Sequence, residues 1–275
     1  MTSILLFTAL LSGPKIDADV VYAKVGETEL KMDLYRPHEV EEGTKLPVVV
    51  VVHGGAWISG NKKDMARICE AFVEQGMAAA TVQYRLAPAH KWPAMIDDCQ
   101  AAVRFLRDQS GTYSLNPQRM GACGASAGGH LSLLLGMMET RDQAVESKTS
   151  SKVSCVLNLF GPTDVSKDFS TTLADSFSKA VLGKPLAEAA DEIAAFSPVH
   201  HAVKGGAPVF TIHGTEDTLV PIAQVDRLDE ALRAVGVEHE FRKVEGMGHA
   251  LPVEKPEVAQ ALTEGLAWVK AKLAG

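Results

Sequence analysis

The chain has 275 residues, 46% of them hydrophobic, and a net charge of −7. This length and composition fit one α/β domain with a large core. The 27 basic residues are scattered, which argues against an electropositive nucleic-acid surface. The four cysteines fall in predicted helices and core strands without zinc-type spacing, which favours buried free thiols over disulfides. No linker or repeat interrupts the chain, so we expect a single domain over residues 19–275.

Residues 4–11 form an apolar run that is followed by Ser12-Gly13-Pro14. The run has the length of a signal-peptide core and is too short to span a membrane, although no basic residue precedes it. We therefore expect residues 1–18 to be an export signal of a secreted or periplasmic protein. The alternative is an N-terminal extension that packs against the domain of a cytoplasmic protein.

Hydrophobic periodicity predicts strands and helices that alternate along the chain. Residues 19–25 and 29–35 alternate in polarity around Gly26-Glu27, which predicts an antiparallel hairpin at a sheet edge. The valine-rich run 47–52 is typical of a strand buried on both faces of a parallel sheet. The further expected strands are 77–83, 119–123, 153–159, 209–212 and 238–244, and the expected helices are 64–75, 94–109, 127–139, 222–235 and 256–273. This alternation predicts an α/β fold with a mainly parallel sheet covered on both faces.

Residues 161–206 do not follow this alternation. They contain two short helical patterns, over 171–182 and 186–196, and three prolines. We expect this insertion to form a small lid over a substrate cleft. The alternative is a pair of surface helices without substrate contact.

Ser126 lies in Gly124-Ala125-Ser126-Ala127-Gly128, between the predicted strand 119–123 and the helix 127–139. A serine between glycines at a strand-to-helix turn is the nucleophile-elbow pattern. The glycines permit backbone angles and close approaches that a Cβ would block, so the hydroxyl is presented at the top of the sheet.

A serine hydroxyl needs a base within hydrogen-bond reach, and the base needs a group that fixes its tautomer. His249 lies on the loop after the last predicted strand, and Glu216 and Asp217 follow the strand 209–212. The order serine, acid, histidine is that of α/β-hydrolases. We assign Ser126 as the nucleophile and His249 as the general base; the residues alone leave both acids open.

The other polar candidates are expected to have structural roles. We expect His213, at a strand end, to be buried and hydrogen-bonded to backbone, and His130 to pack in the helix that follows Ser126. His200-His201 are assigned to the surface of the lid. Asp97-Asp98 are adjacent on a helix and therefore point in different directions, which favours solvation or helix capping over metal binding.

The backbone N–H groups of Gly55, Ala56 and Ala127 are the predicted oxyanion hole. The glycine pair in His53-Gly54-Gly55-Ala56-Trp57 follows a strand, where the chain can turn its N–H groups toward a developing negative charge. The helix that begins at Ala127 directs the positive end of its dipole there. His53 is expected to brace this loop. Trp57 is assigned to the substrate pocket, with plain packing as the alternative.

The chain resembles α/β-hydrolases of the carboxylesterase kind, close to the hormone-sensitive-lipase-like and the bacterial feruloyl and acetyl-xylan esterase groups. The stretches that carry the resemblance are 33–37, 53–57, Tyr84-Arg85-Leu86-Ala87-Pro88, 124–129, 213–217 and 248–249. The resemblance implies that Asp217, not Glu216, orients His249. Ala56 stands where the lipase-like group has a third glycine, and Gly-Gly-Ala-Trp is more similar to the feruloyl, acetyl-xylan and arylformamidase branches.

These observations together predict a serine carboxylesterase that hydrolyses short-chain or aromatic acyl esters through an acyl-enzyme. The esters include small molecules and acetyl or feruloyl groups on plant polysaccharide. The chemistry requires no metal, nucleotide or flavin. The alternatives are an arylformamidase-like amide hydrolase and a non-catalytic binding protein of the same fold. We expect no nucleic-acid partner and no membrane span, and the sequence leaves a homodimer open.

Overall fold

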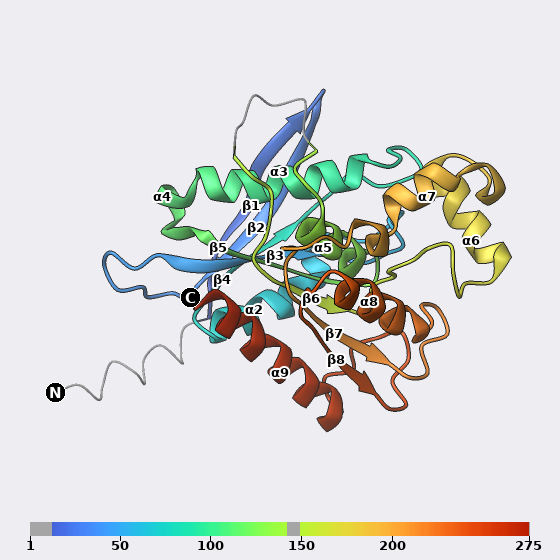
Figure 1. Cartoon of the computed structure of the whole chain (residues 1–275). Helices are drawn as coiled ribbons and strands as arrows, with labels where there is room; N and C mark the ends of the chain where they lie inside the picture. The colour runs from blue at the N-terminus through green and yellow to red at the C-terminus, as the bar shows by residue number, and fades with distance from the viewer. Residues whose placement is uncertain (1–12, 142–148, 275) are drawn as a thin grey trace.

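The computed structural model describes residues 13–141 and 149–274. These residues form an α/β-hydrolase fold around an eight-stranded, mainly parallel sheet with the strand order β1-β2-β4-β3-β5-β6-β7-β8 (Figure 1). The strands are β1 Lys15–Val25, β2 Thr28–Arg36, β3 Leu46–Val52, β4 Ala78–Val82, β5 Leu115–Ala125, β6 Val156–Leu159, β7 Val209–Gly214 and β8 His239–Val244. The predicted α/β fold is thus confirmed.

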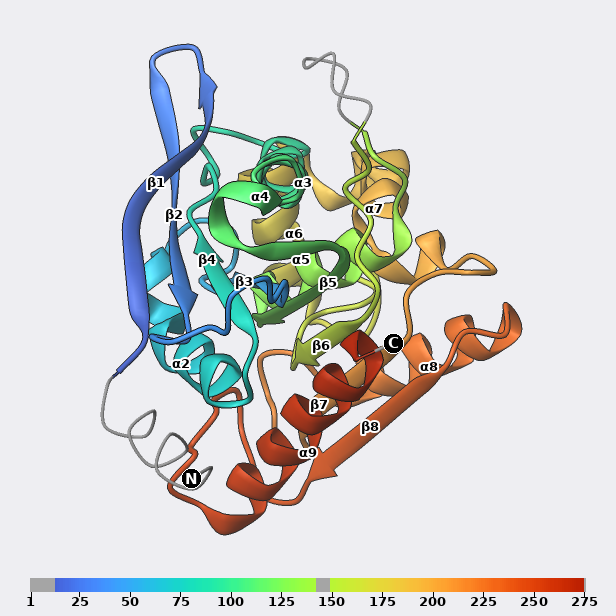
Figure 2. The same ribbon diagram turned by 90° about the vertical axis from the view of Figure 1, so that its left-hand side faces the viewer.

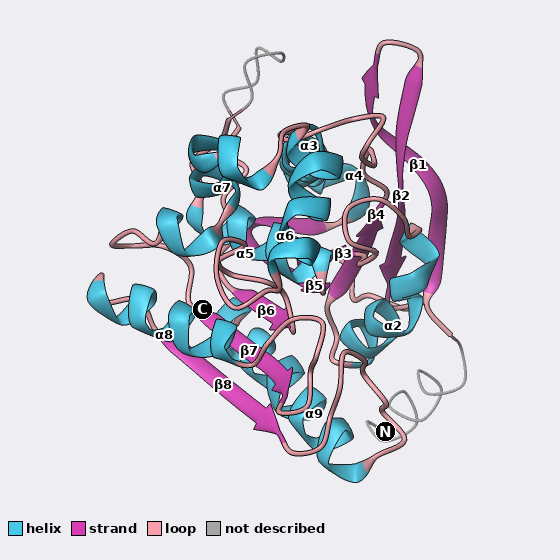
Figure 3. Ribbon diagram, turned by 90° about the vertical axis from the view of Figure 1, so that its right-hand side faces the viewer, coloured by secondary structure: helices cyan, strands magenta, loops and turns pink. Residues whose placement is uncertain are grey.

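Antiparallel pairing is confined to one edge of the sheet. β1 pairs with β2 as the predicted hairpin, β2 runs antiparallel to β4, and the strands from β4 to β8 pair in parallel. Figure 3 shows the hairpin at the opposite edge from β8. β1 begins at Lys15, so part of the expected N-terminal extension belongs to the sheet. The apolar run 4–11 assigned to an export signal lies outside the described residues.

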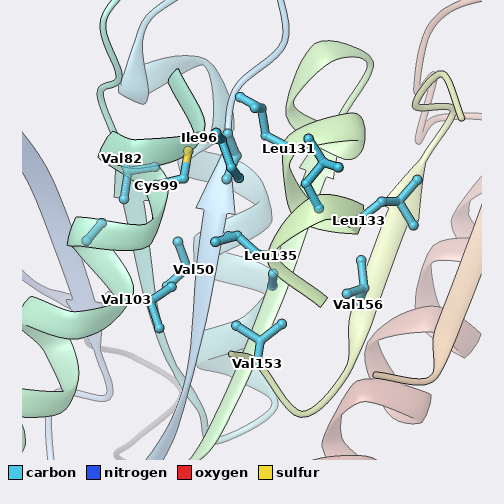
Figure 4. Packing of buried hydrophobic residues seen from close by; sticks show 14 of the residues in the cluster. Val50, Val82, Ile96, Cys99, Val103, Leu131, Leu133, Leu135, Val153 and Val156 are labelled. Atoms are coloured by element: carbon cyan, nitrogen blue, oxygen red, sulfur yellow. The ribbon is translucent and has the colours of Figure 1, made fainter. Parts of the chain in front are cut away.

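The longer helices cover both faces of the sheet. α3 (Ala94–Asp108), α5 (Ala127–Met137) and α8 (Ala223–Ala234) pack on one face, and α2 (Ala66–Glu74) and α9 (Pro256–Leu273) pack on the other. Figure 4 shows side chains of α3 and α5 meeting Val50 of β3 and Val156 of β6. Figure 2 shows α9 lying along β7 and β8. Within residues 13–141 and 149–274, none of the helices combines the length and the apolar character needed to cross a bilayer.

Two helix boundaries differ from the sequence prediction. The helix expected from residue 64 begins as a 3₁₀ turn, Lys62–Met65, which Asn61 and Asp64 close as a reciprocal capping box. The helix expected over 94–109 ends at Asp108, and the chain then makes one more short helix, α4 (Ser110–Tyr113). Ser114 then ends that helix in the left-handed conformation, with φ 55°.

Residues 161–206, here called the cap segment, contain only short helical elements. These are α6 (Thr171–Phe177), a π-helical turn (Ser178–Leu182), a 3₁₀ turn (Leu186–Glu188), α7 (Ala190–Phe196) and a second 3₁₀ turn (Pro198–His201). Figure 1 shows α6 and α7 on the opposite side of the molecule from α4. The two predicted helical patterns are both present, each divided into shorter pieces.

Candidate active site

Ser126 stands alone between β5 and α5 in a strained backbone conformation. Its φ is 55° and its ψ is −121°, a combination that costs free energy for a residue with a Cβ. The neighbouring glycines allow this tight turn. A Cβ on Gly124 would lie 2.2 Å from the carbonyl oxygen of Gly128, and a Cβ on Gly128 would lie 2.0 Å from that of Val52. The turn therefore packs backbone against backbone, for the reason that the sequence pattern predicts.

The structure brings Ser126, His249 and Asp217 together in one hydrogen-bonded chain. His249 Nε2 lies 2.8 Å from Ser126 Oγ, and His249 Nδ1 lies 2.7 Å from Asp217 Oδ2. The carboxylate accepts a hydrogen bond from Nδ1–H, so Nε2 is left to accept the proton of the serine hydroxyl. Phe160 packs edge-on against the His249 ring at a centroid distance of 4.9 Å. Glu216, the rival acid, is exposed to solvent.

Asp217 is buried and surrounded by donors. Besides His249, its carboxylate accepts hydrogen bonds from the backbone N–H groups of Leu219 (2.9 Å) and Val220 (2.8 Å). Burial raises the pKa of Asp217, but hydrogen bonds from His213, His249 and the N–H of Val220 outweigh it and bring that pKa well below its usual range. Asp217 is consequently an anion at neutral pH.

His213 makes the backbone hydrogen bond that the sequence predicts and also contacts the acid. Its Nε2 lies 2.8 Å from the carbonyl oxygen of Val220 and 3.3 Å from Asp217 Oδ2. Both neighbours are acceptors, so the ring proton resides on Nε2. Among the described residues, Nδ1 of this buried ring has no hydrogen-bond partner. The contact with Asp217 was not predicted; the four-residue spacing in His213-Gly214-Thr215-Glu216-Asp217 is its only sequence signal.

The loop after β3 turns sharply beside the serine. Gly55, Ala56 and Trp57 all have positive φ, at 105°, 52° and 63°, and a Cβ on Gly55 would lie 2.2 Å from the carbonyl oxygen of Ser59. Ala56 and Ala127 line the same pocket as Ser126. The N–H of Ala127 is in the first turn of α5, where a helix offers no internal acceptor. The predicted oxyanion donors thus lie on two backbone segments that both border the serine pocket.

His53 and Tyr84 lie under this loop. Their rings stack at a centroid distance of 4.3 Å, and His53 Nδ1 lies 2.8 Å from the carbonyl oxygen of Gly54. The Tyr84 hydroxyl donates to the carbonyl oxygen of His53 at 3.1 Å. Burial lowers the pKa of His53, which keeps its ring neutral. His53 thus contacts the loop that it was predicted to brace, whereas the role of Tyr84 was missed.

The expected solvation or capping role is wrong for Asp98. Its side chain is 1% exposed and forms a bidentate ion pair with Arg85, with an Nε–Oδ2 distance of 2.9 Å and an Nη2–Oδ1 distance of 2.7 Å. It also accepts the N–H of Arg85 at 2.8 Å. Asp97, in contrast, pairs with Arg141 at 3.2 Å on the surface. The missed signal is that Asp98 follows Met95 by three residues and so lies on the buried face of α3.

The pocket beside Ser126 is mainly apolar. Its walls come from the loop after β3 (residues 53–57, the oxyanion loop), the start of α5, the cap segment and the loop after β7. The lining residues are Ala56, Trp57, Ser126, Ala127, Pro162, Val165, Phe169, Phe177, Leu219 and Val220. The cap segment thus contacts the pocket, which disfavours the alternative of remote surface helices.

Trp57 both lines this pocket and packs in the core. It is 2% exposed, and its Nε1 donates to His130 Nδ1 at 3.3 Å. His130 in turn donates from Nε2 to the carbonyl oxygen of Phe196 at 2.6 Å. Burial lowers the pKa of His130 to about 3, so the ring is neutral and structural, as predicted. Of the pair assigned to the lid surface, His200 is exposed, but His201 is half-buried and lies 2.8 Å from the carbonyl oxygen of Ala195.

The cysteines and acidic residues of the described chain form no evident metal centre. All four cysteines are buried free thiols, as expected. Within residues 13–141 and 149–274, no three histidine, cysteine or acidic side chains gather closely enough to hold a metal ion.

Comparisons with known proteins identify related hydrolases. The probable carboxylic ester hydrolase LipM of Mycobacterium tuberculosis is 27% identical over 225 residues, which are 80% of this chain and 52% of LipM. The chain thus spans about half the length of the curated relatives that it matches. A truncated carbohydrate esterase from gut microbiota has the same fold, with a TM-score of 0.83, 24% identity and coverage of 96% of this chain and 100% of that one.

A second solved structure is esterase 2 of Thermogutta terrifontis phosphorylated by paraoxon. It has a TM-score of 0.77 and 25% identity, and the match covers 95% of this chain and 94% of that one. The model of the BD-FAE family matches residues 32–232, which include Ser126, Asp217 and the oxyanion loop but not His249. The chain belongs to the BD-FAE family.

Proposed function

We propose that the chain is a serine carboxylesterase that hydrolyses short-chain or aromatic acyl esters through an acyl-enzyme. The observation that carries this proposal is the unbroken chain of hydrogen bonds from Ser126 Oγ through His249 to the buried carboxylate of Asp217. A nucleophile, a base and an orienting acid in this order are what acyl transfer requires. The names of the curated relatives, which include a carboxylic ester hydrolase and two esterases, support the same activity.

In the first half of the reaction, Ser126 Oγ attacks the carbonyl carbon of the ester while His249 Nε2 takes the hydroxyl proton. The negative charge that develops on the carbonyl oxygen is stabilised by the N–H groups of Gly55, Ala56 and Ala127 and by the dipole of α5. Removal of one such donor typically costs about 2.7–4 kcal/mol of transition-state stabilisation. His249 then donates its proton to the leaving alcohol, and an acyl-enzyme on Ser126 remains.

In the second half, a water molecule replaces the alcohol. His249 takes a proton from this water, the resulting hydroxide attacks the acyl carbonyl, and the proton returns to Ser126 Oγ as the acid leaves. Asp217 remains an anion throughout and stabilises the imidazolium of His249 in both halves. We assign the cap segment as a lid that closes the pocket over the acyl group, because Pro162, Val165, Phe169 and Phe177 line it.

A panel of substrates tests the activity and its class. We expect turnover of p-nitrophenyl acetate and butyrate, and we would compare acetylated xylan, a feruloyl ester and the amide N-formylkynurenine. The matched variants are Ser126→Ala and Ser132→Ala; Ser132 is buried on α5, and its hydroxyl has no partner among the described residues. Ester hydrolysis that is lost in Ser126→Ala and kept in Ser132→Ala supports the proposal. Equal activity of the two variants, or turnover of the amide alone, contradicts it.

A further inference from the structure

A second apolar cavity lies next to the serine pocket, mostly within the cap segment. Trp57, Val165 and Phe177 line both spaces and therefore form a common wall. The remaining walls of the second cavity come from α6, the π-helical turn, the 3₁₀ turn that begins at Leu186, and α7, with Ala174 and Ile193 among the lining residues. The second cavity does not include Ser126 among its lining residues.

The lining of both spaces suits hydrocarbon. Neither is lined by an acidic, basic or histidine side chain. The polar side chain in the second cavity is Ser178, and its hydroxyl already donates to the carbonyl oxygen of Lys184 at 2.8 Å. A charged group or a sugar ring would find no partner there, and unpaired polar groups are costly to bury. The occupant that matches this chemistry is an aliphatic chain.

The common wall has a fixed part and a replaceable part. Trp57 is anchored by its hydrogen bond to His130 and by edge-on contact with Phe196 at 4.9 Å. Phe177 is half-buried at the end of α6, and its ring meets Trp57 edge-on at 5.8 Å. Truncation of Phe177 would therefore join the two spaces without removing a hydrogen bond.

The part of an ester that suits an enclosed pocket is the acyl group. In the acyl-enzyme mechanism, the acyl group stays covalently attached to Ser126 while the alcohol must depart before water attacks. A chain attached through its carbonyl to Ser126 lies in the pocket that Val165 and Phe177 separate from the second cavity. The distance from Ser126 to this wall therefore limits the length of the acyl chain that the enzyme accepts.

We propose that Phe177, together with Val165, limits the length of the aliphatic acyl chain, and that the second cavity is the extension that Phe177 closes off. This inference rests on the proposed esterase function. It names the substrate class as short, uncharged acyl esters and makes Phe177 a specificity-determining residue.

The test compares p-nitrophenyl octanoate with p-nitrophenyl butyrate. For Phe177→Ala, we expect the octanoate-to-butyrate ratio of kcat/KM to increase at least tenfold over wild type, because the longer chain then buries its methylenes in the second cavity. The matched control is Phe169→Ala, since Phe169 is also half-buried and lines only the serine pocket; its ratio should change less than threefold. Adding Leu186→Trp, which fills the second cavity, should reverse the gain of Phe177→Ala.

An unchanged ratio in a folded Phe177→Ala variant, or an equal increase in Phe169→Ala, overturns the inference. If Phe177→Ala does not fold, the milder Phe177→Leu takes its place with hexanoate, and an increase below threefold overturns the inference. If the wild-type enzyme hydrolyses butyrate through Ser126 and Phe177→Ala leaves the ratio unchanged, only this inference is contradicted. Absence of any Ser126-dependent ester hydrolysis contradicts the proposed function itself.

Discussion

The turn that holds Ser126 and the cap segment above it are built in different ways. Around the turn, backbone meets backbone: the Cα positions of Gly124 and Gly128 have carbonyl oxygens so close that a methyl group cannot be added. In the cap segment, side chains form the pocket wall, such as Phe169 from a loop and Phe177 from the end of the short helix α6. Backbone packing fixes where the reaction takes place, whereas exchangeable side chains decide what fits. Substitutions in the Ser126 turn should therefore lower activity towards all substrates, whereas substitutions in the cap segment should change which substrates are accepted.

The largest effect is expected for Gly128→Ala, which attacks the backbone packing directly. The new Cβ would lie 2.0 Å from the carbonyl oxygen of Val52, so the start of α5 must move. We expect kcat/KM to fall at least about 100-fold, because displacement by about 1 Å has this cost. Overpacking should also lower the free energy of unfolding by about 1–3 kcal/mol. Steady-state kinetics and urea denaturation measure both.

The matched control is Gly111→Ala in α4, where an added Cβ meets nothing within 4 Å. It should leave activity unchanged and alter the free energy of unfolding by about 1 kcal/mol or less. Wild-type activity in Gly128→Ala would show that the Ser126 turn tolerates an added side chain. The turn would then not differ from the cap segment in its tolerance of substitution.

A second prediction concerns the support of the oxyanion loop. Tyr84 contacts this loop, and the next residue, Arg85, is held by its ion pair with Asp98. Asp98→Ala leaves the Arg85 guanidinium without its buried carboxylate and should lower the free energy of unfolding by about 3–5 kcal/mol. Asp97→Ala removes the partly exposed carboxylate that pairs with Arg141 and should cost less than about 1 kcal/mol. Equal losses in urea denaturation would mean that the Asp98 pair is no more important than a surface contact.

His213 is predicted to position Asp217 for catalysis. His213→Phe removes the Nε2–H that lies 3.3 Å from the carboxylate, which should raise the pKa of Asp217 toward its ordinary range and loosen its hold on His249. We expect kcat to fall about tenfold with little change in KM, consistent with the loss of one hydrogen bond to a charged group. His213→Gln keeps a donor and should recover most of kcat. A change in KM with an unchanged kcat would contradict this positioning role.

The last prediction concerns the response of stability to mild acid. Burial lowers the pKa of His130 to about 3 and that of His239 to about 4, while the unfolded value is near 6.5. Both rings are neutral in the folded protein, so the unfolded state binds more protons below pH 6.5, and stability present above that pH is lost as the pH falls toward 4. The expected slope is at most about 1.4 kcal/mol per pH unit for each ring.

Urea denaturation at pH 7, 6 and 5 measures this slope. His239→Gln should reduce it, because one of the two neutral rings is removed. An unchanged slope in this variant would show that His239 is protonated as readily in the folded as in the unfolded chain.

The sequence predicted what depends on local pattern. The valine run of β3 and the Gly-Ala-Ser-Ala-Gly turn around Ser126 are each recognisable within a short stretch of sequence, so both could be predicted without long-range contacts. The pairing of Asp98 with Arg85 was missed because it joins a helix to a loop thirteen residues away, and only the burial of that face of α3 reveals it. The division of the pocket by Phe177 also required the structure, since the cap segment has no regular period from which its contacts follow.

The account depends on a serine hydroxyl that His249 and Asp217 have made nucleophilic. The most direct measurement is incubation of the purified chain with a fluorophosphonate, followed by intact-mass analysis and peptide mapping. We predict a single adduct on Ser126 that is absent in Ser126→Ala, strongly slowed in His249→Ala and unaffected in Ser132→Ala. An unlabelled wild-type chain, or an adduct on another residue, would contradict the central claim.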